Sequence, residues 1–240
     1  GFKAAYSLLR RGIAVTMLIR SGYPLSMQVD ETAGKMIQDV LEAQGLTVRT
    51  GVSVDAFEGN GRVRGAHLSD GSRIACEMVV IGKGVFPAHD FVPSDKFRID
   101  AGILVDNHMQ TSVEGVFAAG DIAEHMDIAR QRPWVNAIWP EAVSQGRVAG
   151  MNMAGQLVSY RGSLSRNVIR IFDTDVMTAG RVSPRDLDDT CRTFAARDPR
   201  RSTYRKLVFK DDILVGFTMI NDIEQGGVLM SMIQGRRPVT

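Results

Sequence analysis

This chain of 240 residues contains few cysteines and histidines and carries a small net charge. Two cysteines, Cys76 and Cys191, cannot build a disulfide framework, and neither lies in a CxxC pair, so we expect reduced thiols and a cytoplasmic protein. The four histidines lack metal-ligand spacing, which argues against a metal site. A net charge of +2 gives no field suited to nucleic acid or an anionic membrane. No apolar run is long enough to span a bilayer.

The remaining composition is that of a globular protein. Apolar residues make up 44% of the chain and charged residues 23%, which is typical of folded domains. A length of 240 residues allows one large domain or two ordinary ones, each with a core.

The segment 111–121, TSVEGVFAAGD, is the most informative part of the sequence. Its pattern predicts a turn and then a short buried strand from Gly115 to Asp121. The small residues Ala119 and Gly120 would let the backbone approach a flat ligand closely. Asp121 could accept hydrogen bonds from sugar hydroxyls while capping a following helix, and the alternative is that it is only a helix N-cap.

A second segment, 139–150, has the sequence WPEAVSQGRVAG and predicts a helix with small residues on its packing face. Together, the two segments resemble the second FAD-contacting segment and the W-P-x-A-x-x-Q-G-x-x-A stretch of the pyridine nucleotide-disulfide oxidoreductase superfamily. In that family the N-terminal end of this helix faces the isoalloxazine. The alternative is an ordinary packing helix rich in Gly and Ala. The resemblance implies FAD contacts from Gly120, Asp121, Trp139, Pro140, Glu141 and Ala142.

The chain opens on a predicted helix, 1–12, followed directly by a predicted strand, 14–20. Helix, glycine and strand form the second half of a βαβ unit, so Gly1 resembles the last glycine of a GxGxxG loop. We therefore expect a fragment that lacks the N-terminal FAD/ADP-binding part of its family. Such a piece alone should hold FAD poorly and be inactive, because the pyrophosphate-binding loop would be missing.

The predicted fold class is α/β, with three units along the chain. Residues 1–87 should form a Rossmann-like NAD(P)-binding domain with a β-meander, in which the apolar run 78–82 is a central parallel strand. Residues 88–160 resemble the C-terminal half of an FAD-binding domain. Residues 161–240 predict a C-terminal α+β interface domain.

The pattern of the last unit predicts strands at 168–172 and 176–180, then a hairpin over 204–220 with its turn at Asp211-Asp212. Helical spacing of apolar residues predicts a closing helix at 223–239. This unit resembles the C-terminal domain of the family branch that holds nitrite reductase large subunits and rubredoxin reductases.

The resemblance also implies a site for NAD(P)H, built by Gly1, Arg20, Gly82 and Gly84. Arg20 ends the first strand, where NADH-using relatives usually carry an acidic residue. A guanidinium can pair with the 2′-phosphate of NADPH, so Arg20 favours NADPH and leaves NADH open, unless it is only a solvated charge. Lys3 replaces the Glu that many relatives place near the nicotinamide, and it cannot accept that hydrogen bond. The loop around Gly82 and Gly84 is then the better candidate.

These features imply an enzyme, an FAD-dependent NAD(P)H oxidoreductase. It would pass hydride from the nicotinamide to the flavin and electrons onward to a rubredoxin- or ferredoxin-like protein or a small acceptor. No catalytic side chain can be assigned, and a homodimer is left open. One alternative is a thiol-dependent NADH oxidase or CoA-disulfide reductase. The other is a non-catalytic redox-sensing module that binds a dinucleotide.

Overall fold

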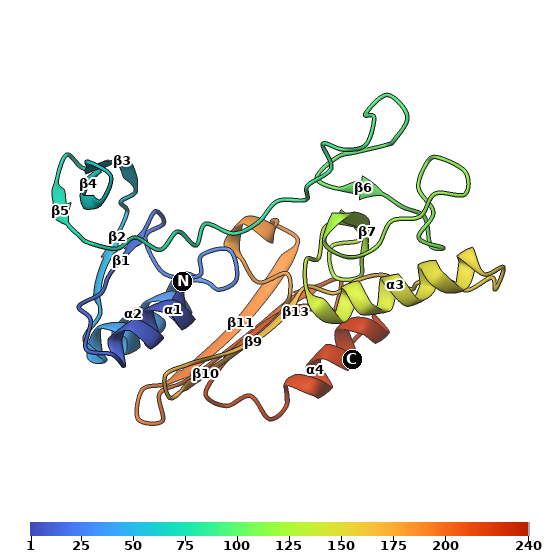
Figure 1. Cartoon of the computed structure of the whole chain (residues 1–240). Coiled ribbons are helices and arrows are strands. Elements are labelled where there is room, and N and C mark those ends of the chain that lie inside the picture. The colour runs from blue at the N-terminus through green and yellow to red at the C-terminus, as the bar shows by residue number, and fades with distance from the viewer. Residues whose placement is uncertain (240) are drawn as a thin grey trace.

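The computed structural model describes residues 1–239, and α-helices and β-strands alternate through its first part. The N-terminal elements lie at one side of the molecule, and a long segment without regular structure joins them to the middle part of the chain (Figure 1). A five-stranded antiparallel sheet from the last third lies between these two parts (Figure 1). The α/β class predicted from the sequence is confirmed.

The N-terminal unit contains two helices, a parallel strand pair and an antiparallel meander. Strands β1 and β2 pair in parallel, with Thr16 opposite Thr47. Strands β3, β4 and β5 form the meander in sequence order, as predicted. The elements are α1 (Phe2–Leu9), β1 (Thr16–Ile19), α2 (Glu31–Ala43), β2 (Thr47–Thr50), β3 (Val54–Gly59), β4 (Val63–Leu68) and β5 (Arg73–Ala75).

The predicted central strand at 78–82 is wrong. This segment has no regular structure and its apolar side chains are exposed, Ile81 to 67%. An extended segment becomes a strand only when a neighbour satisfies its N–H and C=O groups. Within the described part of the chain, β1 and β2 pair only with each other, and no backbone hydrogen bond involves residues 78–82.

The middle of the chain combines short strands with one long helix. It contains β6 (Ile103–Leu104), β7 (Ala123–Asp127), β8 (Arg132–Trp134) and α3 (Trp139–Met153). The strand predicted from Gly115 to Asp121 is wrong, because this segment makes only the single bridge between Phe117 and Gln110. Asp121 lies in a 3-10 turn, Gly120–Ile122, that leads into β7, so it does not cap a following α-helix.

The last third forms the largest sheet, in the order β11-β12-β13-β10-β9, and a final helix contacts it. Its elements are β9 (Arg166–Ile171), β10 (Thr174–Gly180), β11 (Cys191–Asp198), β12 (Thr203–Lys210), β13 (Ile213–Ile220) and α4 (Gly226–Gly235).

The predicted hairpin turn at Asp211-Asp212 is confirmed, and both residues adopt positive φ, which Asp tolerates. The closing helix is shorter than predicted and ends where Arg236 turns left-handed at φ 47°. Strand β11 was not predicted, because its side chains are almost all solvent-facing and give no apolar alternation.

One hydrophobic core joins the N-terminal unit to the last sheet. Ile37 and Leu41 of α2 are fully buried and share a cluster with Ile171 and Val176. The spacing of the apolar residues in α2 puts them on one face, and that face packs on the sheet. A second cluster, centred on Phe217, lies between the sheet and α4.

Asp30 strengthens this contact from the N-cap of α2. Its Oδ1 accepts a hydrogen bond from the Ala33 N–H at 3.0 Å. Its Oδ2 accepts one from the Tyr204 hydroxyl at 2.7 Å and lies 3.0 Å from Lys206 Nζ. Burial, followed by the hydrogen bond to Asp30 and the Asp30 charge, raises the pKa of Tyr204 above its usual range. One carboxylate therefore caps a helix and fixes it to the sheet.

Candidate functional site

Gly120 has a backbone conformation that favours glycine, and it packs against α3. Its φ is +81°, a left-handed value that L side chains rarely adopt. A Cβ at this position would lie 3.4 Å from the Cβ of Ala142 in α3. The Gly120 N–H donates to Oε1 of the buried Gln145 at 2.8 Å. The backbone at Gly120 is thus held directly against the first turns of α3.

Helix α3 begins there without a side-chain cap. Its N-cap residue is Ile138, and Trp139 and Pro140 open the first turn. Trp139 is 81% exposed, and Pro140 is also exposed. Pro140 has no N–H and the Glu141 N–H donates to the Ile138 carbonyl at 3.1 Å, so within residues 1–239 the first turn offers the Trp139 N–H and the positive end of the helix dipole to an anionic or carbonyl group.

Asp121 follows Gly120 and is exposed. Within residues 1–239 its carboxylate has no hydrogen-bond or ion-pair partner. The structure therefore brings five of the six predicted FAD residues to one place: Gly120, Asp121, Trp139, Pro140 and Ala142. Their contact with FAD stays a prediction.

Glu141 differs from its neighbours, because its side chain is buried in the protein. It is 5% exposed, pairs with Arg166 Nη1 at 2.8 Å and accepts a hydrogen bond from the Tyr160 hydroxyl. Burial, followed by Glu141, raises the pKa of Tyr160 well above its usual range. Glu141 thus ties the first turn of α3 to β9. Because its carboxylate is engaged there, the FAD contact predicted for Glu141 would have to come from its other atoms.

A histidine completes this buried group behind α3. The His125 ring lies 5.2 Å from the Tyr160 ring, and its Nε2 lies 3.0 Å from Asn107 Oδ1. Because an amide oxygen only accepts, Nε2 carries the proton, and the buried Nδ1 has no partner in residues 1–239. Burial lowers the pKa of His125. The imidazole is therefore neutral and positions Tyr160 by packing.

Sequence reasoning missed the supporting residues of this site. Tyr160 and Arg166 lie 19 and 25 positions after Glu141, beyond any helical or strand spacing. Gln145 was within reach, because the W-P-x-A-x-x-Q-G stretch contains it. Its position one turn after Glu141 on the same helix face predicts a shared buried side.

Of the four residues predicted to bind NAD(P)H, Gly1 and Gly82 lie close together. A Cβ on Gly82 would lie 3.2 Å from the backbone nitrogen of Gly1, so the two backbones are close. Gly84 has φ +90° and open space around it. Arg20 follows β1, is exposed, and has no acidic partner in the described chain. The structure brings neither Gly84 nor Arg20 into contact with Gly1 or Gly82.

Residues 1–239 contain no group of three His, Cys, Asp or Glu side chains placed to bind a metal. Cys76 and Cys191 are free and half-buried. None of the helices in this range has both the length and the hydrophobicity needed to cross a bilayer.

Comparison with known proteins places this geometry in a family. The pyridine nucleotide-disulphide oxidoreductase family model matches residues 1–146. The model of the rubredoxin NAD+ reductase C-terminal domain matches residues 166–237.

Individual relatives match nearly the whole chain. It is 28% identical to a nitrite reductase [NAD(P)H] of Bacillus subtilis, covering 98% of this chain and 28% of that protein. It is 24% identical to an NADH-rubredoxin oxidoreductase of Clostridium acetobutylicum, covering 99% of this chain and 56% of that protein. The chain thus spans well under two thirds of the length of either relative.

A solved structure has the same fold. The NAD-dependent persulfide reductase from A. fulgidus superposes with a TM-score of 0.89 at 22% identity, covering 99% of this chain and 47% of that one. The matched family model spans more than half of the 240 residues and includes both the 111–121 segment and the start of α3. The chain therefore belongs to the pyridine nucleotide-disulphide oxidoreductase family.

Proposed function

We propose that this chain is part of an FAD-dependent NAD(P)H oxidoreductase that passes hydride from nicotinamide to flavin and electrons onward to an acceptor. The observation that carries the proposal is the contact between Gly120-Asp121 and the uncapped start of α3. Two segments that the sequence singles out independently meet there, through the hydrogen bond from the Gly120 N–H to Gln145 Oε1 at 2.8 Å. Within residues 1–239 they leave the Asp121 carboxylate without a partner and the start of α3 exposed.

The residues at this place fit FAD. Gly120 and Ala142 offer little side-chain bulk, which suits a flat ring system. The Asp121 carboxylate would accept hydrogen bonds from ribityl-type hydroxyls, and the α3 N-terminus would lie toward the electron-rich side of the ring. When bound, FAD supplies the redox chemistry, and the protein contributes orientation and electrostatics. Glu141 acts through Arg166 and Tyr160, which hold the first turn of α3 in place.

NAD(P)H would be held by the N-terminal unit. Gly1 and Gly82 supply adjacent backbone without side chains, and Gly84 supplies a left-handed turn. Arg20 lies at the carboxyl end of β1, the edge of a parallel sheet where nucleotides bind in α/β folds. An exposed guanidinium without an acidic partner is suited to a 2′-phosphate, so we propose NADPH as the preferred donor, with NADH as the alternative.

The acceptor we propose is a small iron-containing electron-transfer protein of the rubredoxin or ferredoxin type. The match of residues 166–237 to the rubredoxin reductase C-terminal domain and the relative named NADH-rubredoxin oxidoreductase support this choice. A cytoplasmic location and a homodimer accompany the proposal as further expectations. The three domains, 1–87, 88–160 and 161–240, are proposed with the boundaries predicted from the sequence.

Anaerobic titration, with NADPH and with NADH, of the complete FAD-loaded oxidoreductase of which this chain is proposed to be part tests the proposal. We expect bleaching of the flavin absorbance near 450 nm, with NADPH the more efficient donor. Arg20→Glu should lower the ratio of NADPH to NADH efficiency by about tenfold or more, because a carboxylate repels the 2′-phosphate. Arg64→Glu, the same charge change at an exposed position of β4, is the matched control and should leave the preference unchanged. Bound FAD that neither nicotinamide reduces would contradict the enzyme proposal.

A further inference from the structure

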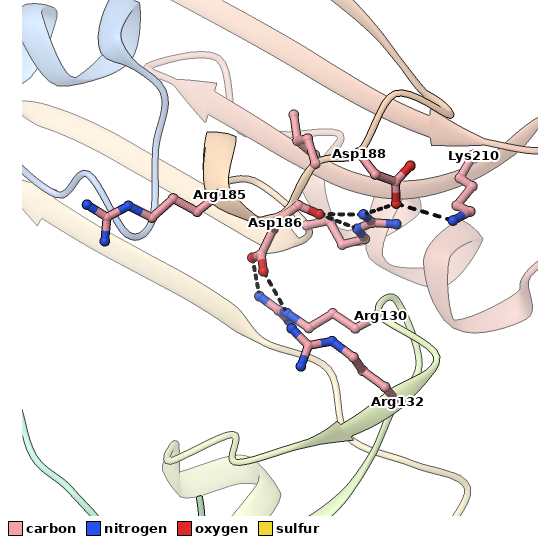
Figure 2. Close-up of a pocket in the computed structure, with 8 residues that line it drawn as sticks. Arg130, Arg132, Arg185, Asp186, Asp188 and Lys210 are labelled. Atoms are coloured by element: carbon pink, nitrogen blue, oxygen red, sulfur yellow. Dashed lines mark hydrogen bonds and ion pairs between the residues drawn. The ribbon is translucent and has the colours of Figure 1, made fainter.

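Two groups of ion pairs join the middle of the chain to its last third. The first group lies between the β7–β8 hairpin and the β10–β11 connection, and Figure 2 shows Asp186 beside Arg130 and Asp188 beside Lys210. Its three cations are matched by three carboxylates, so the group is balanced in charge. The pairs are Arg130 with Asp127 and Asp186, and Arg181 and Lys210 with Asp188.

The second group lies behind the first turn of α3 and depends on one ion pair. Oε1 of Glu141 lies 2.8 Å from Nη1 of Arg166, the first residue of β9, and the two side chains are 6% and 26% exposed. Oε2 of Glu141 accepts a hydrogen bond from the Tyr160 hydroxyl. Within residues 1–239, Arg166 is the cation that pairs with Glu141, and Arg166 pairs with no other carboxylate.

The other titratable members of the second group are neutral. Burial, followed by the hydrogen bond to Glu141 and the Glu141 charge, raises the pKa of Tyr160 well above its usual range, so the phenol keeps its proton. Burial lowers the pKa of His125, whose ring lies 5.2 Å from that of Tyr160. The net charge behind α3 is therefore determined by Glu141 and Arg166 alone.

The position of Glu141 in the first turn gives its charge a consequence for the helix. A carboxylate in the first turn of an α-helix offsets the positive end of the helix dipole. Without a counter-charge, Glu141 would weaken the positive potential at the start of α3, where Trp139 and Pro140 are exposed. Arg166 supplies the counter-charge from β9, and burial of the carboxylate limits screening of the pair by salt.

The buried side of α3 also contacts the other segment of the candidate FAD site. Gln145 follows Glu141 by four residues and is 2% exposed, and its Oε1 accepts the Gly120 N–H at 2.8 Å. Residues four apart lie on the same face of a helix. The face of α3 that pairs with the C-terminal sheet is therefore the face that holds the backbone at Gly120.

We propose that Arg166 is a positioning residue for the flavin site. Its charge cancels that of Glu141, so that the start of α3 keeps the positive potential that stabilises a reduced, negatively charged flavin. This inference rests on the proposed function, because it takes FAD as the ligand at the start of α3. Arg166 acts through Glu141 and the helix, so the C-terminal sheet contributes to the electrostatics of the flavin site from behind α3.

The midpoint potential of the bound flavin, measured at one fixed pH in the complete FAD-loaded oxidoreductase, tests the proposal. Arg166→Gln leaves the Glu141 carboxylate without its counter-charge. It should lower the potential by about 30 mV, which corresponds to tenfold weaker binding of reduced relative to oxidised FAD. Glu141→Gln leaves the Arg166 charge uncompensated and should raise the potential.

Two further variants serve as controls for these shifts. Arg166→Lys keeps the positive charge and should restore most of the wild-type potential. Arg170→Gln is the matched change at a position of the same strand whose side chain is 64% exposed, and it should leave the potential unchanged.

Opposite shifts in Arg166→Gln and Glu141→Gln separate an electrostatic role from a structural one, because loosening of α3 would move both potentials in the same direction. Shifts of the same sign, or no shift in either variant, would overturn the proposal. If Arg166→Gln does not fold, Glu141→Gln decides alone, and an unchanged or lowered potential would overturn it.

Failure of the proposed function has a different result. A wild-type oxidoreductase that holds no FAD, or whose FAD neither nicotinamide reduces, would contradict the proposed function and this inference with it. A flavin that NADPH or NADH reduces, with the same potential in all variants, would defeat the role of Arg166 alone.

Discussion

The two sheets at opposite ends of the chain differ in how completely they bury their apolar residues. In the C-terminal sheet, the inner strands β12, β13 and β10 each pair on both sides, and Phe217 and Met219 are fully buried. In the N-terminal unit, the short parallel strands β1 and β2 pair, within residues 1–239, only with each other, and the segment 78–86 lies exposed, Phe86 to 90%.

The difference follows from the two kinds of sheet. An antiparallel sheet builds its ladder from segments joined by short turns, whereas a parallel sheet needs neighbours from distant parts of the chain. The C-terminal sheet therefore reaches its full set of partners within 55 residues, from Arg166 to Ile220. We therefore expect the C-terminal sheet to contribute most of the free energy of unfolding. The exposed residues of the N-terminal unit should contribute less to it and remain available to contact other molecules.

The largest expected effect is the loss of the buried ring at the centre of the C-terminal sheet. Phe217→Ala should lower the free energy of unfolding by about 4 kcal/mol, because it leaves a cavity under α4. Val80→Ala, in the exposed segment, should change it by less than about 0.5 kcal/mol. Urea denaturation measures both. Similar losses in the two variants would show that the two regions do not differ as described.

A smaller effect is expected where the two regions meet. Asp30→Ala should destabilise by about 2–3 kcal/mol, because it removes a helix cap and leaves Tyr204 and Lys206 without their partner. Asp30→Asn keeps an acceptor for the cap and should lose less. Glu31→Ala removes only an exposed pair with Lys35 and should cost less than about 0.5 kcal/mol. Equal losses of unfolding free energy in Asp30→Ala and Glu31→Ala would show that Asp30 does not join α2 to the C-terminal sheet.

The smallest effect concerns pH and the buried imidazole behind α3. Burial lowers the pKa of His125 in the folded protein below 6.5, its ordinary value, so unfolding takes up a proton below that pH. The contribution of His125 is complete above pH 6.5 and is lost as pH falls toward the folded-state pKa. We expect the free energy of unfolding to fall between pH 7 and pH 5.5, with a His125 contribution below the one-proton limit of about 1.4 kcal/mol per pH unit, measured by urea denaturation at each pH. His125→Gln should show a shallower slope, and an unchanged slope would assign the effect to other groups.

Local pattern predicted the elements that depend on neighbours close in sequence. Helix α2 has an Asp cap and one apolar face, and the β12–β13 hairpin has a two-residue Asp turn, so each carries its own signals. The errors arose where the outcome depends on distant partners. Segment 78–82 has the composition of a buried strand but no hydrogen-bonding neighbour in the described structure, and β11 gains its strand geometry from β12 alone.

The residues of the candidate site also fall into those that a local motif predicts and those that depend on distant partners. Gly120, Asp121 and the start of α3 were found from their motifs, because close approach of backbone demands small residues in a fixed order. The inward position of Glu141 could not be found, since it depends on Tyr160 and Arg166, which belong to a different part of the fold.

The most direct test of the central claim is the affinity of the protein for FAD, measured by quenching of FAD fluorescence. Asp121→Asn keeps the shape of the side chain and removes its charge, and Asp95→Asn is the matched change at an exposed position elsewhere. If the carboxylate at 121 holds the flavin's hydroxyl-bearing chain, Asp121→Asn should raise the dissociation constant by about tenfold, while Asp95→Asn leaves it unchanged. Equal affinity of both variants and the wild type would contradict the account.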